Sequence, residues 1–584
     1  MTATQTLAGL QPGTYTVSAQ DVVAAGGTPY TATPASQDVS VVAGATATAT
    51  VTYSPPSSGD LNLKIDGMYL TQSAQTYGGA VPLVQNRNGY LRVFVVANRT
   101  NVATTSVRVR FYKNLVLENE VSIPAPGLSV PTAVDESSLS YSWNVPVAGA
   151  VIQPGLSIIA EVDPDNAVAE SDEGDNAFPA GAPLAMNVRS TPTLSLTFVP
   201  VVQAGNGRRG NVSDANTGDF MADAKRMHPL ASYDASVHAQ YTTTTSDTLQ
   251  DDNGNNAWVT ILNEIDLLRQ AEASSRYYYG VVKVSYTSGV AGVAYVSEPA
   301  NGIHARAALG WDYLPSGSLV AAHELSHNWS RNHAPCGDPG NVDSEYPYAD
   351  GSIGVYGLDV EAQALKPPSF SDIMGYCDDK WISDYTYSAV LDYLSPPSLL
   401  VMGGSSQQPQ PSLLVWGYIR EGQPVLEPAF LVHTRPSLPR RSGPYTLEAQ
   451  ASDGSTVFAL SFSPKEIADA PGNQQNFVFA VPLSSVAASQ MSRLSLRGYG
   501  REAVLDAKSR PSAGVQLGRL AGERVRLRWD AGAHPMVMVR DPDTGEVLSL
   551  ARGGDVQLQT SKTTLELVLS DGVKSRITRV PVSQ

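Results

Sequence analysis

The stretch that decides this chain reads His323-Glu324-Leu325-Ser326-His327-Asn328-Trp329-Ser330-Arg331-Asn332-His333. It holds three of the chain's eight histidines. Two of them stand four residues apart, so on a helix both imidazoles share one face and can reach one metal ion. His333 comes six residues after His327, and the chain must turn back for its ring to join them. Three protein ligands with one open position are typical of a catalytic zinc site rather than a structural one.

Glu324 directly follows the first histidine, so it flanks the metal instead of binding it. A carboxylate in that position can take a proton from a water molecule at the metal. The alternative interpretation of the stretch is a surface helix with scattered histidines.

The eleven residues resemble the long zinc signature of the metzincin metallopeptidases, HExxHxxGxxH. The chain carries the variant HExxHxxSxxH, with Ser330 where the family has glycine. Glycine accepts a positive φ at no steric cost, whereas serine adopts it only with strain of about 1 kcal/mol. The difference therefore concerns the turn after the helix and leaves the three histidine ligands as the family has them.

A second stretch matches the methionine turn of the same family: Ser371-Asp372-Ile373-Met374-Gly375-Tyr376-Cys377. The resemblance implies that Met374 lies beneath the zinc as a hydrophobic floor. It implies that Tyr376 binds the zinc in the resting state or stabilises the oxyanion. Taken alone, Met374 is also consistent with ordinary core packing.

The chain has only two cysteines, Cys336 and Cys377. By the resemblance, both lie in loops on the same side of the zinc. A disulfide between them would close a 41-residue loop, stabilise the fold by ~4 kcal/mol and indicate an oxidising compartment. Two buried free thiols, or a cysteine ligand to zinc, are the alternatives.

Composition sets further bounds. A length of 584 residues predicts three to five domains. The net charge of −16 argues against nucleic acid and anionic membranes as partners. No apolar run reaches the roughly 18 residues needed to span a bilayer. The first 30 residues lack the basic and apolar regions of a signal peptide, so we expect Met1 to begin an expressed or processed fragment of a larger secreted bacterial protein.

The predicted fold is multidomain, with an α/β (α+β) metzincin-like catalytic domain flanked by all-β Ig-like sandwich domains. Period-two alternation and linkers rich in Pro, Gly and Ser predict the boundaries. The predicted units are a partial prealbumin-like or Ig-like β domain at 1–55, a β-sandwich resembling CARDB and other Ig-like repeats at 60–188, the zinc peptidase at 190–400, and β-sandwiches at 411–508 and 513–584.

Two further sites are predicted. In metzincins, the last strand before the zinc helix is an edge that pairs with extended substrate. The resemblance thus implies substrate binding by Ala291, Gly292, Val293 and Ala294, although a plain core strand is an equal alternative. Seven carboxylates between Glu161 and Asp175 are dense enough to hold Ca²⁺, but a solvated acidic turn is the favoured interpretation.

The predicted function is that of a secreted zinc endopeptidase acting on extracellular proteins or glycoproteins. One alternative is an adhesion or binding protein whose peptidase domain is inactive or secondary, with β-modules that bind host or matrix protein or carbohydrate. Others are a protease selective for glycosylated, mucin-like proteins and a zinc hydrolase acting on another amide, such as an N-acyl sugar.

Overall fold

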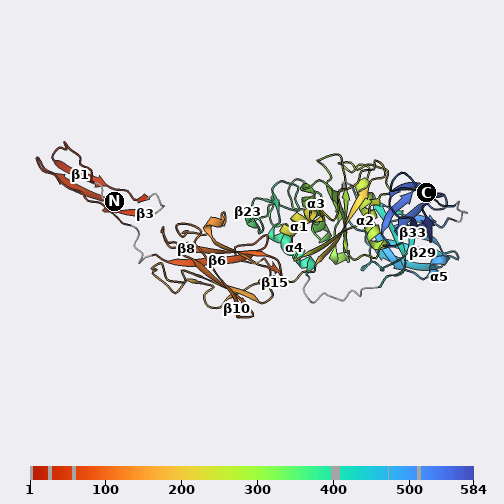
Figure 1. The fold of residues 1–584 in the computed structure, drawn as a ribbon, viewed down its shortest axis with the longest axis horizontal. Coiled ribbons are helices and arrows are strands. Elements are labelled where there is room, and N and C mark those ends of the chain that lie inside the picture. The colour runs from red at the N-terminus through yellow and green to blue at the C-terminus, as the bar shows by residue number, and fades with distance from the viewer. Residues whose placement is uncertain are drawn as a thin grey trace. The chain divides into compact units, whose positions relative to one another are not determined.

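The computed structural model describes residues 4–23, 29–54, 61–79, 81–395, 408–470, 472–508 and 514–583. It divides into two compact units (Figure 1). Unit 1 comprises Met1–Arg189 and Val355–Pro367, and unit 2 comprises Ser190–Gly354 and Pro368–Gln584. Strand accounts for 41% of the structure and helix for 11%, so the protein is mostly β. The boundaries of the five predicted domains stay predictions.

The main body of unit 1 is built from two antiparallel sheets around one core. Side chains alternate along β9, where Val107, Val109 and Phe111 are buried and the arginines between them are half-buried. This alternation lets one face of a strand pack inward while the other meets water. One sheet has the order β11-β8-β6, and the other has the order β10-β9-β12-β13, with β14 also pairing with β12. The strands are β6 (Leu63–Thr71), β8 (Gly89–Ala97), β9 (Val107–Lys113), β10 (Val116–Ile123), β11 (Trp143–Val147), β12 (Leu156–Val162), β13 (Ala177–Phe178) and β14 (Leu184–Ala185).

Smaller sheets complete unit 1. A hairpin at 355–367 also belongs to it, and there the Leu358 amide donates to the carbonyl of Ser73 at 2.7 Å. The acidic stretch is tied to the sandwich by hydrogen bonds, because buried Asp163 accepts from the hydroxyl of Thr105 at 2.7 Å. The remaining strands are β1 (Gly13–Ser18), β2 (Val22–Val23), β3 (Pro29–Thr33), β4 (Ser36–Val41), β5 (Thr52–Ser54), β7 (Leu83–Val84), β15 (Val188–Arg189), β22 (Gly357–Asp359) and β23 (Ala364–Lys366).

Unit 2 is organised on an eleven-stranded sheet in the order β31-β20-β21-β19-β16-β18-β38-β37-β40-β41, with β17 also pairing with β16. Parallel pairing joins β16, β17, β18, β19 and β21, whereas β20 runs antiparallel to β21. The elements of this part are β16 (Leu194–Val202), α1 (Thr217–Met227), β17 (Tyr233–Val237), β18 (Tyr241–Thr242), α2 (Ala257–Ala271), β19 (Tyr277–Val282), β20 (Gly292–Tyr295), β21 (Ala307–Trp311), α3 (Ser316–Asn328), β24 (Ser371–Asp372), β25 (Lys380–Trp381) and α4 (Asp384–Leu394).

The C-terminal strands both extend that sheet and form sheets of their own. Figure 1 draws them in cyan and blue beside the yellow and green elements of the same unit. They are β26 (Gln410–Arg420), β27 (Gln423–Leu426), β28 (Phe430–Thr434), β29 (Tyr445–Ala451), β30 (Thr456–Phe462), β31 (Ile467–Ala468), β32 (Gln474–Pro482), β33 (Met491–Gly498), β34 (Arg501–Asp506), β35 (Gln516–Arg519), β36 (Arg524–Arg528), β37 (Met536–Arg540), β38 (Val547–Arg552), β39 (Asp555–Gln559), β40 (Thr564–Ser570) and β41 (Ser575–Pro581), with one short helix, α5 (Ser485–Gln490).

The predicted fold class is wrong. The sequence predicts an α/β (α+β) metzincin-like catalytic domain flanked by all-β domains, whereas the structure is mostly β. The described residues form five α-helices of 6 to 15 residues. The physical reason is strand pairing distant in sequence: β38 pairs with β18, and β31 pairs with β20, so strands from beyond residue 460 continue the sheet that precedes the histidines. Alternation of strand and helix within 190–400 cannot reveal such pairing.

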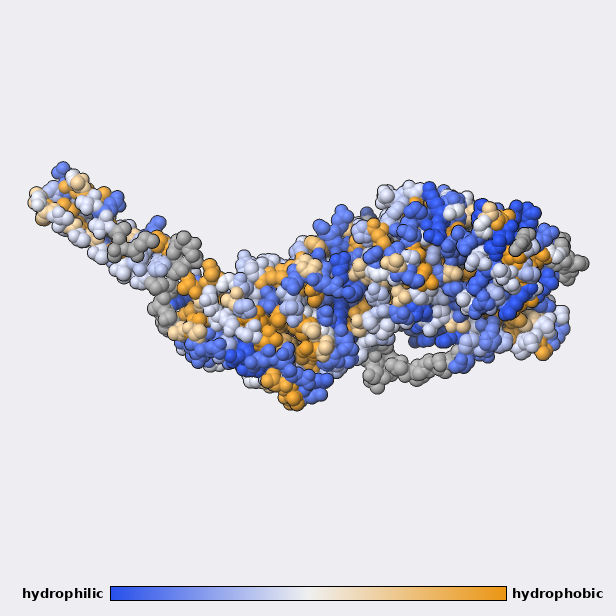
Figure 2. Space-filling model, viewed as in Figure 1, coloured by the Kyte–Doolittle hydropathy of each residue, from blue (hydrophilic) through white to orange (hydrophobic). Residues whose placement is uncertain are grey.

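The surface mixes polar and apolar residues, with orange patches between larger blue areas in the view of Figure 2. Leu115, in the turn between β9 and β10, and Val116 and Leu117, at the start of β10, are exposed. No helix within the described residues is long and apolar enough to cross a bilayer.

Candidate metal centre

Helix α3 presents the first two histidines of the motif. His323 and His327 stand one turn apart on the helix and are both buried. Their Nε2 atoms lie 3.2 Å apart, as the i, i+4 spacing predicts. The helix packs against β20, β21 and α1, so the packing of unit 2 fixes the face that carries these rings.

The turn after α3 brings His333 to the other two. Ser330 has a φ of 69°, in the left-handed region. The amide of Ser330 donates to the carbonyl of His327 at 3.0 Å, and the amide of Arg331 donates to the carbonyl of Ser326 at 3.0 Å. These bonds close the helix and reverse the chain, as left-handed helix ends do. The serine thus takes the backbone conformation that glycine provides in the family signature.

Replacing Ser330 with glycine is expected to stabilise the fold. The left-handed conformation destabilises the folded state by about 1–2 kcal/mol when the residue has a side chain. Glycine removes this strain, but its greater freedom stabilises the unfolded state by about 0.4–1 kcal/mol. The free energy of unfolding should therefore rise by about 0.5–1 kcal/mol, measured by chemical denaturation. Ser316→Gly, at the start of the same helix, is the matched control and should lower it. A loss of stability in S330G would contradict the strain at this turn.

Each imidazole is oriented by a hydrogen bond from its other nitrogen. The Nδ1 atom of His323 bonds the carbonyl of Ile373 at 2.8 Å, that of His327 bonds the carbonyl of Arg331 at 2.6 Å, and that of His333 bonds the carbonyl of Gly340. A carbonyl only accepts, so each Nδ1 carries a proton, and in the neutral ring the Nε2 atom then offers its lone pair to a metal ion. Burial lowers the pKa of His327 to about 4, so its ring is neutral at physiological pH.

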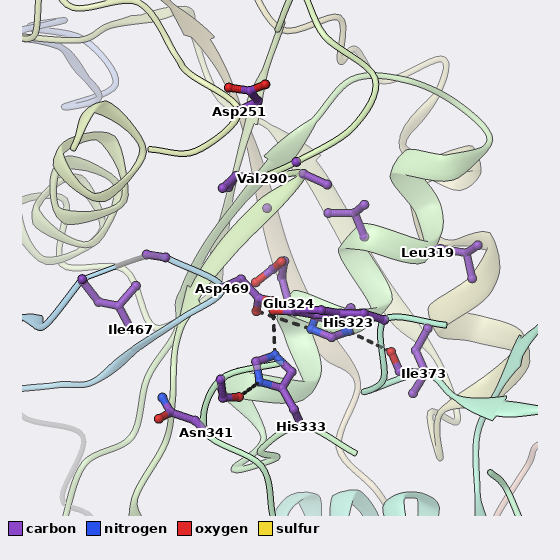
Figure 3. A pocket seen from close by; sticks show the side chains of 18 of the residues that line it. Asp251, Val290, Leu319, His323, Glu324, His333, Asn341, Ile373, Ile467 and Asp469 are labelled. Atoms are coloured by element: carbon purple, nitrogen blue, oxygen red, sulfur yellow. Dashed lines mark hydrogen bonds and ion pairs between the residues drawn. The ribbon is translucent and has the colours of Figure 1, made fainter. Parts of the chain in front are cut away.

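A fourth residue, Asp469, completes the group. One carboxylate oxygen lies 2.8 Å from Nε2 of His327 and 3.4 Å from Nε2 of His323, and the other lies 3.2 Å from Nε2 of His333. In Figure 3, Asp469 lies over His323 and His333, with Glu324 beside it. Asp469 follows β31, far from the motif in sequence. Sequence reasoning missed it because a single aspartate in a loop carries no recognisable spacing.

The donor set fits a divalent metal ion. The three Nε2 atoms and a carboxylate oxygen all lie within 4.8 Å of one another. Imidazole nitrogens and a carboxylate that converge in a buried space need a proton or a metal cation between them. Imidazole nitrogens with a carboxylate oxygen are ligands that zinc accepts. Within the described residues this is the one group of histidine, cysteine or acidic side chains with metal-ligand spacing. The stretch from Glu161 to Asp175, for which the sequence favours a solvated turn over a Ca²⁺ site, is not part of it.

Glu324 lies beside the histidines but binds none of them. Its side chain is buried, and its Oε2 atom has no hydrogen-bond partner within the described part of the chain. Burial, together with the charge of Asp469, raises the pKa of Glu324 well above its usual range. Gly292 makes room for it, because a Cβ atom there would come within 2.4 Å of Oε1 of Glu324. An unpartnered carboxyl group in such a place is available to exchange a proton with a bound molecule.

The predicted methionine turn lies against the histidines through its backbone. The Ile373 carbonyl holds His323, as described above, and the Met374 carbonyl accepts from the amide of Ala334 at 3.1 Å. Met374 itself is buried in this turn. The ring of Tyr376 lies 5.1 Å from that of His333, measured between centroids, and its hydroxyl donates to Asp469. Tyr376 is 44% exposed, so it stands at the rim of the site.

Cys336 and Cys377 form the disulfide expected from the sequence, with Cα atoms 5.7 Å apart. Beside it, the amide of Tyr376 donates to the carbonyl of Cys336 at 2.8 Å. The bond therefore joins the loop after His333 to the turn that holds His323 and Tyr376.

Removing this disulfide is expected to weaken both the fold and the metal site. The double variant C336S/C377S should lose ~4 kcal/mol of unfolding free energy, because the unfolded chain gains the entropy of an open 41-residue loop. Metal affinity should fall with it, because the turn that orients His323 is freed. Denaturant titration and metal titration measure the two effects. Reductant should reproduce them in the natural chain and change nothing in the variant, and an unchanged denaturation midpoint in the variant would contradict the argument.

A cavity of about 890 Å³ opens onto the group. His323, Glu324, Tyr376 and Asp469 line it, with Ala291 and Gly292 on one side. Of the predicted substrate-binding residues, these two face the cavity, whereas Val293 and Ala294 are fully buried in the sheet. The expectation of a free edge strand needs correction: β20 pairs antiparallel with β31, with Ala294 opposite Ala468 and Tyr295 opposite Ile467.

Comparisons with known proteins give little to add. No family model matches the chain, and no curated protein matches it. Among solved structures, a CARDB domain in complex with di-metal ions from Pyrococcus furiosus is 19% identical, covering 22% of this chain and 94% of its own, with a TM-score of 0.15. A beta-glycosidase from Bacteroides vulgatus is 10% identical, covering 91% and 80%, with a TM-score of 0.15. A beta-glucuronidase from Parabacteroides merdae is 9% identical, covering 91% and 78%, with a TM-score of 0.13. Similarities this low carry no argument about function.

Proposed function

We propose that this chain is a zinc-dependent endopeptidase. The observation that carries the proposal is the convergence of three imidazole Nε2 atoms beside a buried, unpartnered carboxyl group, at the wall of a cavity of about 890 Å³. The sequence around it supports peptide bonds as the substrate, because both HExxHxxSxxH and the turn at 371–377 resemble the motifs of metzincin peptidases. The resemblance lies in these motifs alone.

His323, His327 and His333 would hold the zinc ion through their Nε2 atoms. When bound, zinc supplies Lewis-acid activation of water and of the scissile carbonyl. The backbone carbonyls of Ile373, Arg331 and Gly340 keep the three rings in the tautomer that this requires.

Glu324 and Tyr376 act on the substrate and the attacking water. Glu324 accepts a proton from the water as it attacks, and then delivers that proton to the nitrogen of the leaving amine. Its buried Oε2 atom has no hydrogen-bond partner within the described residues, so the carboxylate can take the proton and hold it between the two steps. Tyr376 has its hydroxyl beside the histidines, where it can donate a hydrogen bond to the oxyanion that forms from the carbonyl.

We propose an extracellular location and a protein or glycoprotein substrate. The disulfide between Cys336 and Cys377 supports the location, because such bonds persist in oxidising compartments. The resemblance of the two motifs to those of peptidases supports a protein substrate, and no feature of the cavity walls selects sugar over peptide.

A digest of a complex peptide mixture tests the proposal. Zinc-loaded natural chain, Asp469→Ala and Glu324→Gln are each incubated with proteome-derived peptides, and mass spectrometry finds the new termini. Asp469→Ala is included because, in the natural chain, the carboxylate of Asp469 lies close to the Nε2 atoms of all three histidines. New termini should form with the natural chain or with D469A, and should vanish with a chelator and in E324Q. The proposal fails if zinc is bound and neither protein cleaves, or if E324Q yields the same termini.

A further inference from the structure

We infer that the segment 465–470 is a built-in inhibitor that occupies the metal centre and the substrate cleft. The inference rests on the proposed function and adds a regulatory role for a segment outside the motif. Three observations support it. The Asp469 carboxylate lies against the three histidines, β31 pairs with the edge of β20, and Lys465 anchors the segment to α2.

The Asp469 carboxylate takes the position that a substrate needs. Both of its oxygens lie within 3.4 Å of a histidine Nε2 atom, and it also accepts from the hydroxyl of Tyr376. Three histidines leave one open position on a tetrahedral ion, which catalysis needs for water and the carbonyl. A fourth protein ligand closes that position, as in structural sites. It also engages the hydroxyl proposed to bind the oxyanion.

The backbone of the segment occupies the sheet edge beside the site. Ile467 and Ala468 pair antiparallel with Tyr295 and Ala294 of β20, and the amide of Val296 donates to the carbonyl of Glu466 at 3.1 Å. An extended peptide binds to such an edge by main-chain hydrogen bonds. While β31 is paired, those groups of β20 are already used, and a substrate can align there only after the segment leaves.

The segment is anchored at both ends, by Lys465 at its start and by β32, which begins at Gln474 and pairs with β26, after it. Lys465 forms a buried ion pair with Asp266 of α2, and its ammonium group lies 5.0 Å from the ring centre of Tyr295. Its backbone exchanges hydrogen bonds with Asn476 in both directions. Between the anchors, the pairing of Ile467 and Ala468 with β20, the Glu466 carbonyl and the Asp469 side chain hold the segment in the cleft. Asp469 itself has a φ of 62°, a conformation that aspartate and asparagine tolerate better than most residues.

This arrangement makes the segment an intramolecular competitor. A ligand of the metal binds only to molecules in which Asp469 has moved away from the histidines. The apparent affinity of the ligand is therefore its intrinsic affinity multiplied by the fraction of such molecules. If the open fraction is one in ten or less, removing the carboxylate should tighten binding by about tenfold or more. Peptide cleavage should accelerate by a similar factor.

Cobalt substitution tests this without depending on activity. The full chain is loaded with Co²⁺, and acetohydroxamate, a small metal chelator, is titrated while the visible spectrum of the cobalt is followed. The natural chain is compared with Asp469→Ala and Asp469→Asn, the latter because asparagine keeps the shape of the side chain and accepts the same backbone conformation. Glu466→Ala is the matched control, because it removes an exposed carboxylate from the same segment.

In the two Asp469 variants the cobalt spectrum should change before any ligand is added, and acetohydroxamate should bind about tenfold tighter or more. Glu466→Ala should behave as the natural chain does. Equal spectra and equal affinities in the natural chain and both variants would overturn the inference while leaving the metal site intact. Failure of every protein to bind Co²⁺ would instead overturn the proposed metal centre and, with it, the inhibitor. In the peptide digest, equal cleavage rates for the natural chain and D469A would count against the inhibitor alone.

Discussion

Glu324→Gln is expected to lower kcat about 1,000-fold with the metal still bound, because a positioned general base contributes roughly 10²–10⁴ to such reactions. In barrier height this is about 4 kcal/mol. Glutamine keeps the shape of the side chain but cannot take the proton. The histidines are untouched, so zinc content should stay at that of the natural chain. Cleavage of a fluorogenic peptide found in the digest gives kcat, and elemental analysis gives the zinc.

Glu345→Gln is the matched control, because it makes the same chemical change on an exposed side chain. It should keep full activity. If E324Q retained activity within about tenfold of the natural chain, the assignment of Glu324 as base would be wrong, because that loss is below the range for general bases.

His327→Ala is expected to remove the metal itself. His327 is almost fully buried and its Nε2 atom contacts both His323 and Asp469. Losing an outer partner of a metal ligand typically costs 10–100-fold in affinity, so loss of a direct ligand should cost well over roughly 100-fold. Zinc competition against a chromophoric chelator measures this, and activity should disappear with the zinc.

The control for this variant is His304→Ala, which removes an exposed histidine away from the group. Its zinc affinity should equal that of the natural chain. If H327A bound zinc as tightly as H304A, the ion would have to bind elsewhere in the chain, and the proposed metal centre would be wrong.

The gathering of the three histidines could be predicted because the geometry is local. Helical spacing alone places His323 and His327 on one face, and a reversal of the chain at Ser330 suffices to add His333. The turn at Ser330 has the positive φ that the family signature demands, although its residue is not glycine. The disulfide between Cys336 and Cys377 could be predicted because the chain has only two cysteines.

The rest depends on contacts between distant parts of the chain. Asp469 approaches His333 across 136 residues, and no residue near it in sequence marks it as a ligand. The fold class was wrong for the same reason, because β31 and β38 join the sheet from far downstream. That pairing also turned the expected free edge at Ala294 into a buried, hydrogen-bonded strand. Local periodicity records which face of a strand is buried, but not which strand lies beside it.

Zinc titration of metal-free Asp469→Ala, with peptide cleavage followed at each addition, tests directly whether this chain is a zinc peptidase that works through Glu324. The rate should rise in proportion to bound zinc and level off at one zinc per chain. It should stay about 1,000-fold lower in the double variant E324Q/D469A at the same zinc content. A rate that is independent of zinc, or equal in the two proteins at full zinc occupancy, would contradict a zinc peptidase that works through Glu324.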